Sequence, residues 1–271
     1  MNSACSINLK KSLVKDPRKR TKPLTFFEKD QLILPENSNP LQNHLDEIME
    51  YTNEQNMKIN QGKSKVIVFN FTKKWQFPPE MGFKNYQFLE NAREAKNFGL
   101  VISEDLKWTQ HSNYIVCKAM SRIWSIRRMK NLGLTNDIIF DVYVKEIRSL
   151  LEFGCPVWNG GLLKRDEIKI EKVQKTVLKI LLSSNYKDYA TACKIFCTQT
   201  LAIRREKLCL NFSIKEFKKS NSLFKKYTNE RNTRNNTTTL VHEYKCNTNR
   251  YYKSGLPYLS RLLNQSSNVK K

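Results

Sequence analysis

Two lysines at the start of the most apolar stretch of the chain are the first residues whose type and position could support chemistry. In NQGKSKVIVFNF, residues 60–71, Lys63 and Lys65 precede a run of β-branched and aromatic residues that predicts a buried strand. An ammonium group at this position is either solvated in a turn or stands beside a phosphate. The residues themselves leave both interpretations open.

A second set of candidates is formed by basic residues in two predicted helices. The stretch between Asp105 and Asp137 contains no acidic residue. In the next long helix Lys172, Lys175 and Lys179 recur at spacings of three and four, opposite the apolar stripe. Such a row suits contact with a phosphate backbone, although the charged outer face of an amphipathic helix is more often only solvated. From both segments we expect contacts with nucleic acid by Lys118, Arg122, Arg127, Arg128, Lys172, Lys175 and Lys179.

Three tryptophans near these basic residues could stack on bases. They are Trp108, Trp124 and Trp158. Because tryptophan side chains are more often part of the core, we predict a core position for all three, with Trp124 at the edge of a helix-packing interface.

The charge of the chain favours an anionic partner. The 271 residues carry 48 Lys+Arg against 25 Asp+Glu, a formal net charge of +23. An excess of this size is most often offset by nucleic acid. An anionic membrane is the rival partner, but no stretch approaches the roughly 18 apolar residues of a spanning helix. The partner that we expect is therefore nucleic acid and no membrane.

The N-terminus and the cysteines predict an intracellular protein, cytoplasmic or nuclear. No apolar run suited to a signal peptide stands at the N-terminus. The seven cysteines are odd in number and scattered, which is typical of reduced thiols. Cys193 and Cys197 lack a second Cys/His pair at zinc spacing, so no metal site is expected.

The common nucleotide-binding and hydrolase motifs are absent from the sequence. There is no GxxxxGK[ST], GxGxxG, HExxH or GxSxG pattern, and no two aspartates are adjacent. Neither a small-molecule substrate nor the carboxylate cluster of a metal-dependent nucleotidyl transferase is indicated.

Residue periodicity predicts an α+β fold with two unlike parts. Residues 1–38 form a basic, extended segment. A helix over 40–56 follows, with Asn39 and Pro40 at its start. Short antiparallel strands are predicted over 65–71, 86–90 and 96–102.

The second part, residues 108–218, is predicted to be all-helical. Apolar residues at helical spacing predict a first helix over 110–131, ended by Gly133, and a second that begins at Thr135 or Asn136. CPVWNGG, residues 155–161, is predicted to be a loop. The remaining helices are expected over 165–182, 188–197 and 200–218. The tail, 219–271, is predicted to be poorly ordered or to contain short helices.

The order of these segments resembles a known family. A helix, MKINQGKSKVIVF, NFGLVISEDLKW, HSNYIVCKAMSRIWSIRRMKNLGL, DVYVKEIRSLLEFGCPVW and IEKVQKTVLKILL follow one another over residues 40–215. In this order they look like the later half of the reverse transcriptase of a non-LTR retrotransposon, closest to the LINE-like, jockey-type elements. Each motif is weak singly; six in register make the signal specific.

The resemblance implies roles for particular residues. MKINQGKSKVIVF is similar to motif D of the palm, where a lysine handles the triphosphate; Lys63 is the better positional match and Lys65 the rival. NFGLVISEDLKW is similar to the primer-grip region, which places Phe98, Gly99 and Leu100 in that role. Residues 39–107 then correspond to the end of the palm, and 108–218 to the thumb and connection that clamp the template–primer duplex.

The resemblance also implies what the chain lacks. The family's catalytic Tyr/Phe-x-Asp-Asp hairpin lies just before the segment similar to residues 7–14. We therefore expect a truncated RNA-directed DNA polymerase fragment that is inactive alone, with no cofactor of its own, since Mg²⁺ is implied only for the intact enzyme. The alternative is a helical protein- or RNA-interaction module adopted from such an element, without polymerase function.

Overall fold

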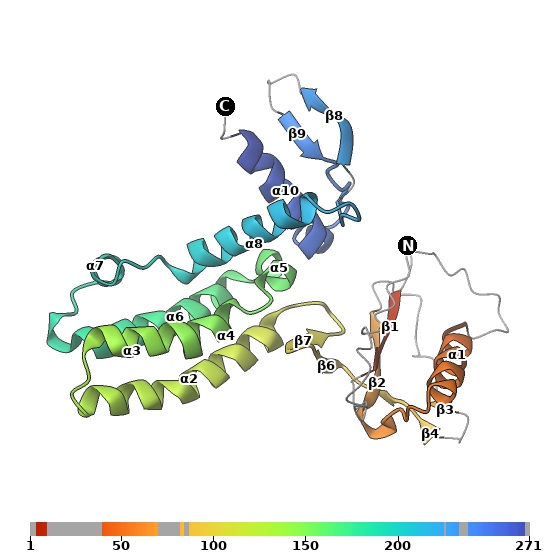
Figure 1. The fold of residues 1–271 in the computed structure, drawn as a ribbon, viewed down its shortest axis with the longest axis horizontal. Coiled ribbons are helices and arrows are strands. Elements are labelled where there is room, and N and C mark those ends of the chain that lie inside the picture. Colours follow the sequence, from red (N-terminus) through yellow and green to blue (C-terminus); the bar gives the residue numbers. More distant parts are fainter. Residues whose placement is uncertain are drawn as a thin grey trace. The chain divides into compact units, whose positions relative to one another are not determined.

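The chain divides into two compact units, Met1–Lys107 and Trp108–Lys271. The computed structural model describes residues 4–9, 40–69, 82–83, 87–224, 226–232 and 238–268 (Figure 1). Helices predominate and short strands accompany them, which is an α+β structure. The division falls where the sequence changes from mixed to helical periodicity.

The first unit packs one helix beside a small mixed sheet. Its helix α1 is Pro40–Glu54, and the sheet order is β1-β2-β5, with β1 antiparallel and β5 parallel to β2. The strands are β1 Ala4–Leu9, β2 Ser64–Phe69 and β5 Glu90–Asn91. The core of this unit includes a cluster of the buried side chains Leu45, Val66 and Leu89, and Ile67 of β2 is withdrawn from water as well.

One prediction for this unit is corrected, and another gains detail. The strands are not all antiparallel, since β2 and β5 run parallel. Part of the segment 1–38 is a strand, β1, which pairs with β2 over its whole length; the rest of that segment, residues 10–38, lies outside the described residues.

The predicted strand 96–102 is instead a hairpin. The strands β6 Glu94–Asn97 and β7 Leu100–Ser103 pair antiparallel, with Asn97 opposite Leu100. Phe98 and Gly99 between them have positive φ values of 47° and 86°. Two central residues with positive φ form the tight turn that matches the twist of paired strands, and glycine adopts this conformation without cost. A second small antiparallel pair consists of β3 Gly82–Phe83 and β4 Gln87–Phe88.

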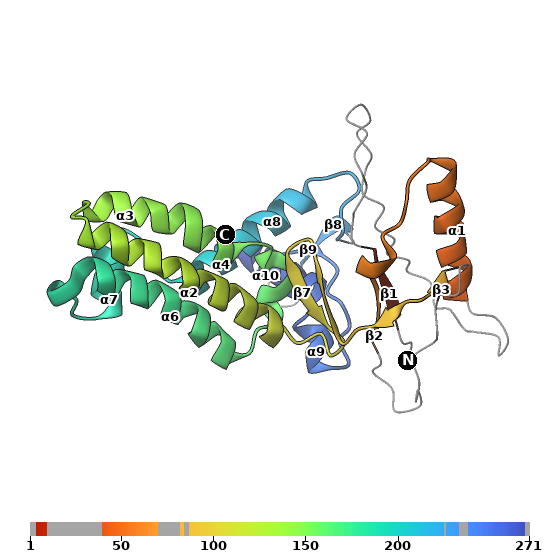
Figure 2. The same cartoon turned by 90° about the horizontal axis from the view of Figure 1, so that it is seen from below.

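The second unit is a helical bundle with a β-hairpin near its C-terminus (Figures 1 and 2). Its longer helices are α2 Thr109–Asn131, α3 Asn136–Val142, α6 Lys164–Leu182, α7 Tyr189–Ile195, α8 Leu201–Phe217 and α10 Gly255–Asn268. The shorter elements are η2 Tyr143–Arg148, α4 Ser149–Glu152, α5 Cys155–Trp158, η3 Asn159–Gly161, η4 Ser183–Asn185, β8 Lys226–Asn232, β9 Thr238–Val241 and α9 Asn249–Tyr252. The predicted helices agree with α2, α6, α7 and α8 to within two residues at each end.

Helix ends follow local chemistry. Gly133, with φ 77°, ends α2 as predicted, since a left-handed residue stops the helix after its last turn. The side chain of Thr200 accepts a hydrogen bond from the backbone N–H of Ile203 and caps α8. The second predicted helix begins at Asn136 and continues through a π-helical turn, η2, into α4.

The predicted loop 155–161 is helical in the structure. Gly154 adopts a left-handed conformation and α5 starts immediately after it. Trp158 is completely buried, and its indole N–H donates to the carbonyl oxygen of Phe153 at 2.9 Å. Burying this large ring stabilises the short helix, a tertiary effect that glycine and proline content alone does not indicate.

The described part of the C-terminal segment, which is predicted to be poorly ordered or to contain short helices, contains the short helix α9 and the longer helix α10, and α10 packs against α8. In α10 the apolar residues Leu259, Leu262 and Leu263 are buried, and Ser213 of α8 donates to the carbonyl of Leu259 at 3.4 Å. The Asn264 amide exchanges hydrogen bonds with the backbone of Val241 in β9, at 3.1 and 3.2 Å. The helix follows a long polar stretch, but the helical spacing of Leu259, Leu262 and Leu263 was a signal that the prediction overlooked.

We predict that Gly160→Ala weakens the packing of α10 against η3. A Cβ at residue 160 would lie 2.5 Å from Cγ of Tyr258 and 2.8 Å from the carbonyl oxygen of Lys253, closer than real contacts allow. We expect the free energy of unfolding to fall by about 1–3 kcal/mol, measured by denaturant titration. Gly62→Ala is the control, since its Cβ would meet only the Asn60 side chain at 3.7 Å. Equal stability of the two variants would contradict this packing.

Candidate nucleic-acid interface

The candidate interface is carried by α2 and α6, which lie side by side and run parallel (Figures 1 and 2). Near their N-termini the Thr109 hydroxyl donates to the Asp166 carboxylate at 2.8 Å. Near their C-termini the Lys130 ammonium donates to the carbonyl oxygen of Leu181 at 2.9 Å. Between these two points the apolar stripes of both helices are buried, so the opposite faces are turned outward.

The lysine row predicted on α6 is exposed, and it is longer than predicted. Lys172, Lys175 and Lys179 are all exposed. Arg165 and Lys169 are exposed too and precede Lys172 at helical spacing. Sequence reasoning missed these two, although the same spacing rule extends the row by two positions.

Three acidic residues of α6 are engaged in contacts within the protein. Asp166 is completely buried and accepts hydrogen bonds from Thr109 and, at 3.2 Å, from Lys169. Glu171 accepts backbone N–H bonds from Leu201 and Ala202, at 3.0 and 3.2 Å.

Glu171 also accepts from the Tyr189 hydroxyl, whose pKa is raised by burial and by this hydrogen bond. The Glu171 carboxylate thus stabilises the N-terminus of α8, where the free backbone N–H groups favour an anion. The third acid, Glu167, is paired with Lys164 at 2.9 Å. The outward face of α6 is therefore strongly positive.

Two lysines of the row are held against tyrosine rings. The ammonium of Lys175 lies 5.0 Å from the centre of the Tyr189 ring, and that of Lys179 lies 5.3 Å from the Tyr186 ring. The attraction of a cation to an aromatic face restricts these long side chains. Less conformational freedom is then lost when they contact a phosphate.

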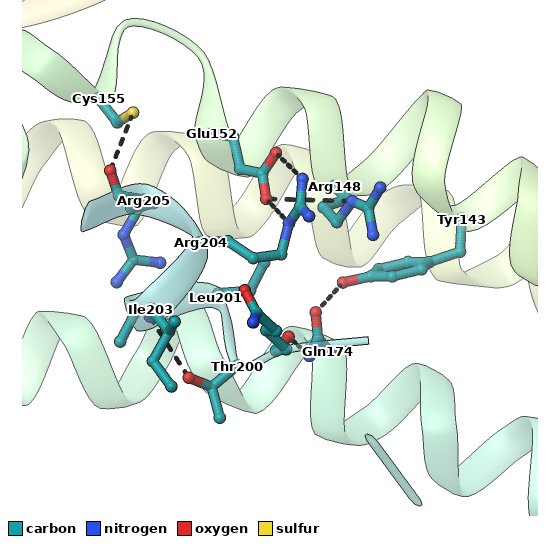
Figure 3. A network of polar contacts seen from close by, with 12 residues as sticks. Tyr143, Arg148, Glu152, Cys155, Gln174, Thr200, Leu201, Ile203, Arg204 and Arg205 are labelled. Carbon is teal, nitrogen blue, oxygen red and sulfur yellow. Dashed lines mark hydrogen bonds and ion pairs between the residues drawn. The ribbon is translucent and has the colours of Figure 1, made fainter. Parts of the chain in front are cut away.

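A buried polar contact fixes the rotation of α6. Gln174 is completely buried, and its amide oxygen accepts from the Tyr143 hydroxyl at 2.6 Å (Figure 3). The amide nitrogen of Gln174 donates to the carbonyl oxygen of Gln199 at 3.0 Å. Burial raises the pKa of Tyr143, which keeps its hydroxyl a donor. Rotating the lysine row inward would break both hydrogen bonds.

The four basic residues predicted on α2 do not share one side of the helix. Arg122 pairs with Glu146 of η2 at 3.2 Å, and Lys118 lies one turn before it. Arg127 and Arg128 are exposed and lie on other sides of the helix. The four basic residues predicted on α2 therefore cannot all contact one nucleic-acid backbone from the same side of the helix.

Asn113 shows which side of α2 adjoins the lysine row. Its side-chain oxygen accepts from Lys169 at 2.9 Å. Arg127 and Arg128 lie about four turns later on the same side, within roughly 60° of Asn113 around the helix. We name as the basic face the residues Arg165, Lys169, Lys172, Lys175 and Lys179 of α6 with Arg127 and Arg128 of α2.

The tryptophan prediction is right for one residue and wrong for another. Trp158 is in the core, and Trp108 is half-buried. Trp124 is 62% exposed. It follows Ile123 by one position, and neighbouring positions on a helix point about 100° apart, so it turns away from the core.

The lysines predicted from motif D are both at the start of β2. Lys63 is exposed in the short turn η1 Gln61–Lys63. Lys65 forms an ion pair with Glu90 on the neighbouring strand at 2.8 Å. Of the two, Lys63 is the one that forms no ion pair with a described residue. Phe98 and Gly99 of the primer-grip-like sequence form the tip of the β6–β7 hairpin, with Phe98 60% exposed and Leu100 just beyond in β7.

No metal site is found within the described ranges, where no three His, Cys, Asp or Glu side chains come together. The described residues therefore do not fit the Mg²⁺ that the resemblance implies for the intact family enzyme. None of the helices in the described part of the chain has both the length and the apolar composition of a membrane span. No family model matches the chain, and no curated protein or solved structure shows significant similarity to it.

Proposed function

We propose that the helical unit binds nucleic acid through the phosphate backbone, using the basic face. The observation that carries the proposal is the charge on the outward side of α6. Its acids Asp166, Glu167 and Glu171 are paired within the protein. Lys172, Lys175 and Lys179 are exposed and form no ion pair with a described residue. Binding of this kind is independent of sequence, because phosphates present the same charge at every base.

The same proposal assigns the chain to the reverse transcriptases of non-LTR retrotransposons, as the end of a palm followed by a thumb. Three observations support it: the collinear motifs over residues 40–215, the change of unit between Lys107 and Trp108, and the exposed position of Lys63 at the start of β2. The partner is then an RNA or DNA template–primer inside the cell. Polymerase activity is not assigned to this chain, and primer extension with Mg²⁺ or Mn²⁺ tests that directly.

The salt dependence of duplex binding tests the proposal. We expect the triple variant Lys172→Gln, Lys175→Gln, Lys179→Gln to bind a blunt duplex more weakly. Its slope of log affinity against log salt should be shallower by about 2.7, because each phosphate contact contributes about 0.9. Fluorescence anisotropy over a range of salt concentrations measures both quantities.

The control removes the same charge elsewhere. Lys207, Lys215 and Lys218 are exposed at or just after α8, and none belongs to the basic face. Replacing these three by glutamine should leave the slope within experimental error of wild type. An equal change in both triple variants would show that only net charge matters, and an unchanged slope in the first would remove those lysines from the interface.

A second candidate is a helical protein-interaction module. It is favoured by exposed large apolar side chains of the helical unit, among them Phe153, 54% exposed, and Ile195, also 54% exposed. An affinity for a protein partner that is insensitive to salt would support this function in place of backbone binding.

A further inference from the structure

Trp124 is a large aromatic residue that the bundle leaves in solvent. It is 62% exposed, whereas Trp158 of the same unit is completely buried. Arg128, one turn later, places its guanidinium carbon 5.3 Å from the centre of the Trp124 ring. This cation–π contact holds the indole in place on the helix surface.

The position of Trp124 links it to the basic face. Asn113, which contacts Lys169 of α6, precedes Trp124 by eleven residues, or about three full helical turns. Both residues therefore lie on the same side of α2, the side that adjoins the lysine row. Arg127 and Arg128 immediately follow Trp124 in the chain.

The surroundings of Trp124 carry positive charge. The sequence has no Asp or Glu between Asp105 and Asp137. Glu146 approaches α2 at Arg122, which lies two residues from Trp124 and thus on nearly the opposite side of the helix. A second copy of this chain, with its net charge of +23, is a poor partner for such a surface, and a polyanion is a good one.

We propose that Trp124 stacks on an unpaired base of a nucleic-acid strand whose phosphates follow the basic face. The inference rests on the proposed function and narrows its substrate to nucleic acid with a single-stranded portion. Bases inside a duplex are stacked on one another, so an indole on a protein surface reaches the face of a base only where the strand is unpaired.

An anionic membrane fits this surface less well. A helix that lies on a membrane needs a continuous apolar stripe. Around Trp124 the exposed positions are instead Cys117, Met120, Ser121, Arg127 and Arg128. The two arginines interrupt the row of exposed apolar side chains between Met120 and Leu132, so it is not continuous. Stacking needs a single ring, which is what the helix presents.

The test compares three ligands: a blunt duplex, the same duplex with a short single-stranded overhang, and that overhang with abasic sites in place of its nucleotides. We expect Trp124→Ala to weaken binding of the base-bearing overhang about tenfold, the usual effect of removing one stacked aromatic ring. Affinity for the blunt and the abasic ligands should change less than about twofold, because their phosphates are the same. Trp124→Phe should restore most of the loss.

Intrinsic fluorescence gives an independent readout. Oligothymidylate should quench the emission of the wild-type chain and fail to do so in Trp124→Phe. Ile203→Ala, which removes an apolar side chain 47% exposed on α8, is the control and should bind all three ligands as wild type does.

Two results would overturn the stacking role. One is that Trp124→Ala lowers the affinity for all three ligands equally. The other is that anionic vesicles shift the Trp124 emission to the blue while the oligonucleotide does not quench it. Failure of the proposed function itself gives a different result: the lysine variant then leaves the slope of log affinity for the blunt duplex against log salt unchanged.

Discussion

Glu152→Gln is expected to lower the free energy of unfolding by about 3 kcal/mol or more, because it leaves two neighbouring arginines without their shared counterion. The Glu152 carboxylate lies between Arg204 and Arg148 (Figure 3). It accepts from both Nε and Nη2 of Arg204, at 2.5 and 3.1 Å, and lies 4.0 Å from Nε of Arg148. The side chains of Glu152 and Arg148 are only 11% and 15% exposed, so water screens the remaining charges poorly.

The pKa directions of the two arginines agree with this role. The hydrogen bond to Glu152 raises the pKa of Arg204. Burial and then the charge of Arg204 lower the pKa of Arg148, and Glu152 opposes that effect. With a neutral glutamine at residue 152 the repulsion between the arginines is no longer compensated, so η2, α4 and α8 are held together less tightly.

Glu146→Gln provides the matched control for this prediction. Glu146 also pairs with one arginine, Arg122, but its side chain is 62% exposed and that of Arg122 is 37% exposed. Ion pairs in solvent contribute about 0–1 kcal/mol. Chemical denaturation of both variants at neutral pH measures the difference. If Glu152→Gln costs no more than Glu146→Gln, the carboxylate does not hold the bundle together.

The main helices could be predicted from the sequence because each has a long apolar stripe. Ile115, Ala119, Ile123 and Ile126 define the inner face of α2 by spacing alone, and the same pattern defines α6. The Glu152 cluster could not be predicted, since Arg204 lies 52 residues away in the sequence. Spacing along one helix says nothing about which distant helix supplies a partner.

The candidate interface could be predicted in part. The lysines of α6 were recognisable by their spacing, and so were Arg165 and Lys169, which were overlooked. That Asp166 is turned inward depends on a hydrogen bond to Thr109, 57 residues away, and is a property of the tertiary fold. The exposure of Trp124 was recognisable from its angle to Ile123; tryptophan's general tendency to be buried gave the wrong prediction.

Acid should destabilise the helical unit through His111. This residue is 1% exposed, with its ring 5.4 Å from the Trp158 ring and 6.1 Å from the Trp108 ring, centre to centre. Burial lowers its pKa from 6.5 to about 4, because the charged imidazolium loses its hydration. Between these two pH values the unfolded chain binds a proton that the folded chain does not.

The sign of the effect follows from that difference in proton binding. Stability is unaffected above about pH 6.5, falls as the pH decreases from there toward 4, and at pH 4 is reduced by about 3 kcal/mol. His111→Phe keeps an aromatic ring in contact with Trp108 and Trp158 but cannot be protonated. The free energy of unfolding of wild type minus that of His111→Phe should therefore decrease by about this amount between pH 7 and pH 4.

Measuring the difference between two variants removes the contribution of the carboxylates, which also titrate near pH 4. His242→Gln, at an exposed histidine, is the matched control variant. A wild-type curve that stays parallel to that of His111→Phe would mean that His111 is protonated without cost in the folded chain. Its burial between the two tryptophan rings makes the opposite result the expected one, since no charge in that position regains the hydration it has in water.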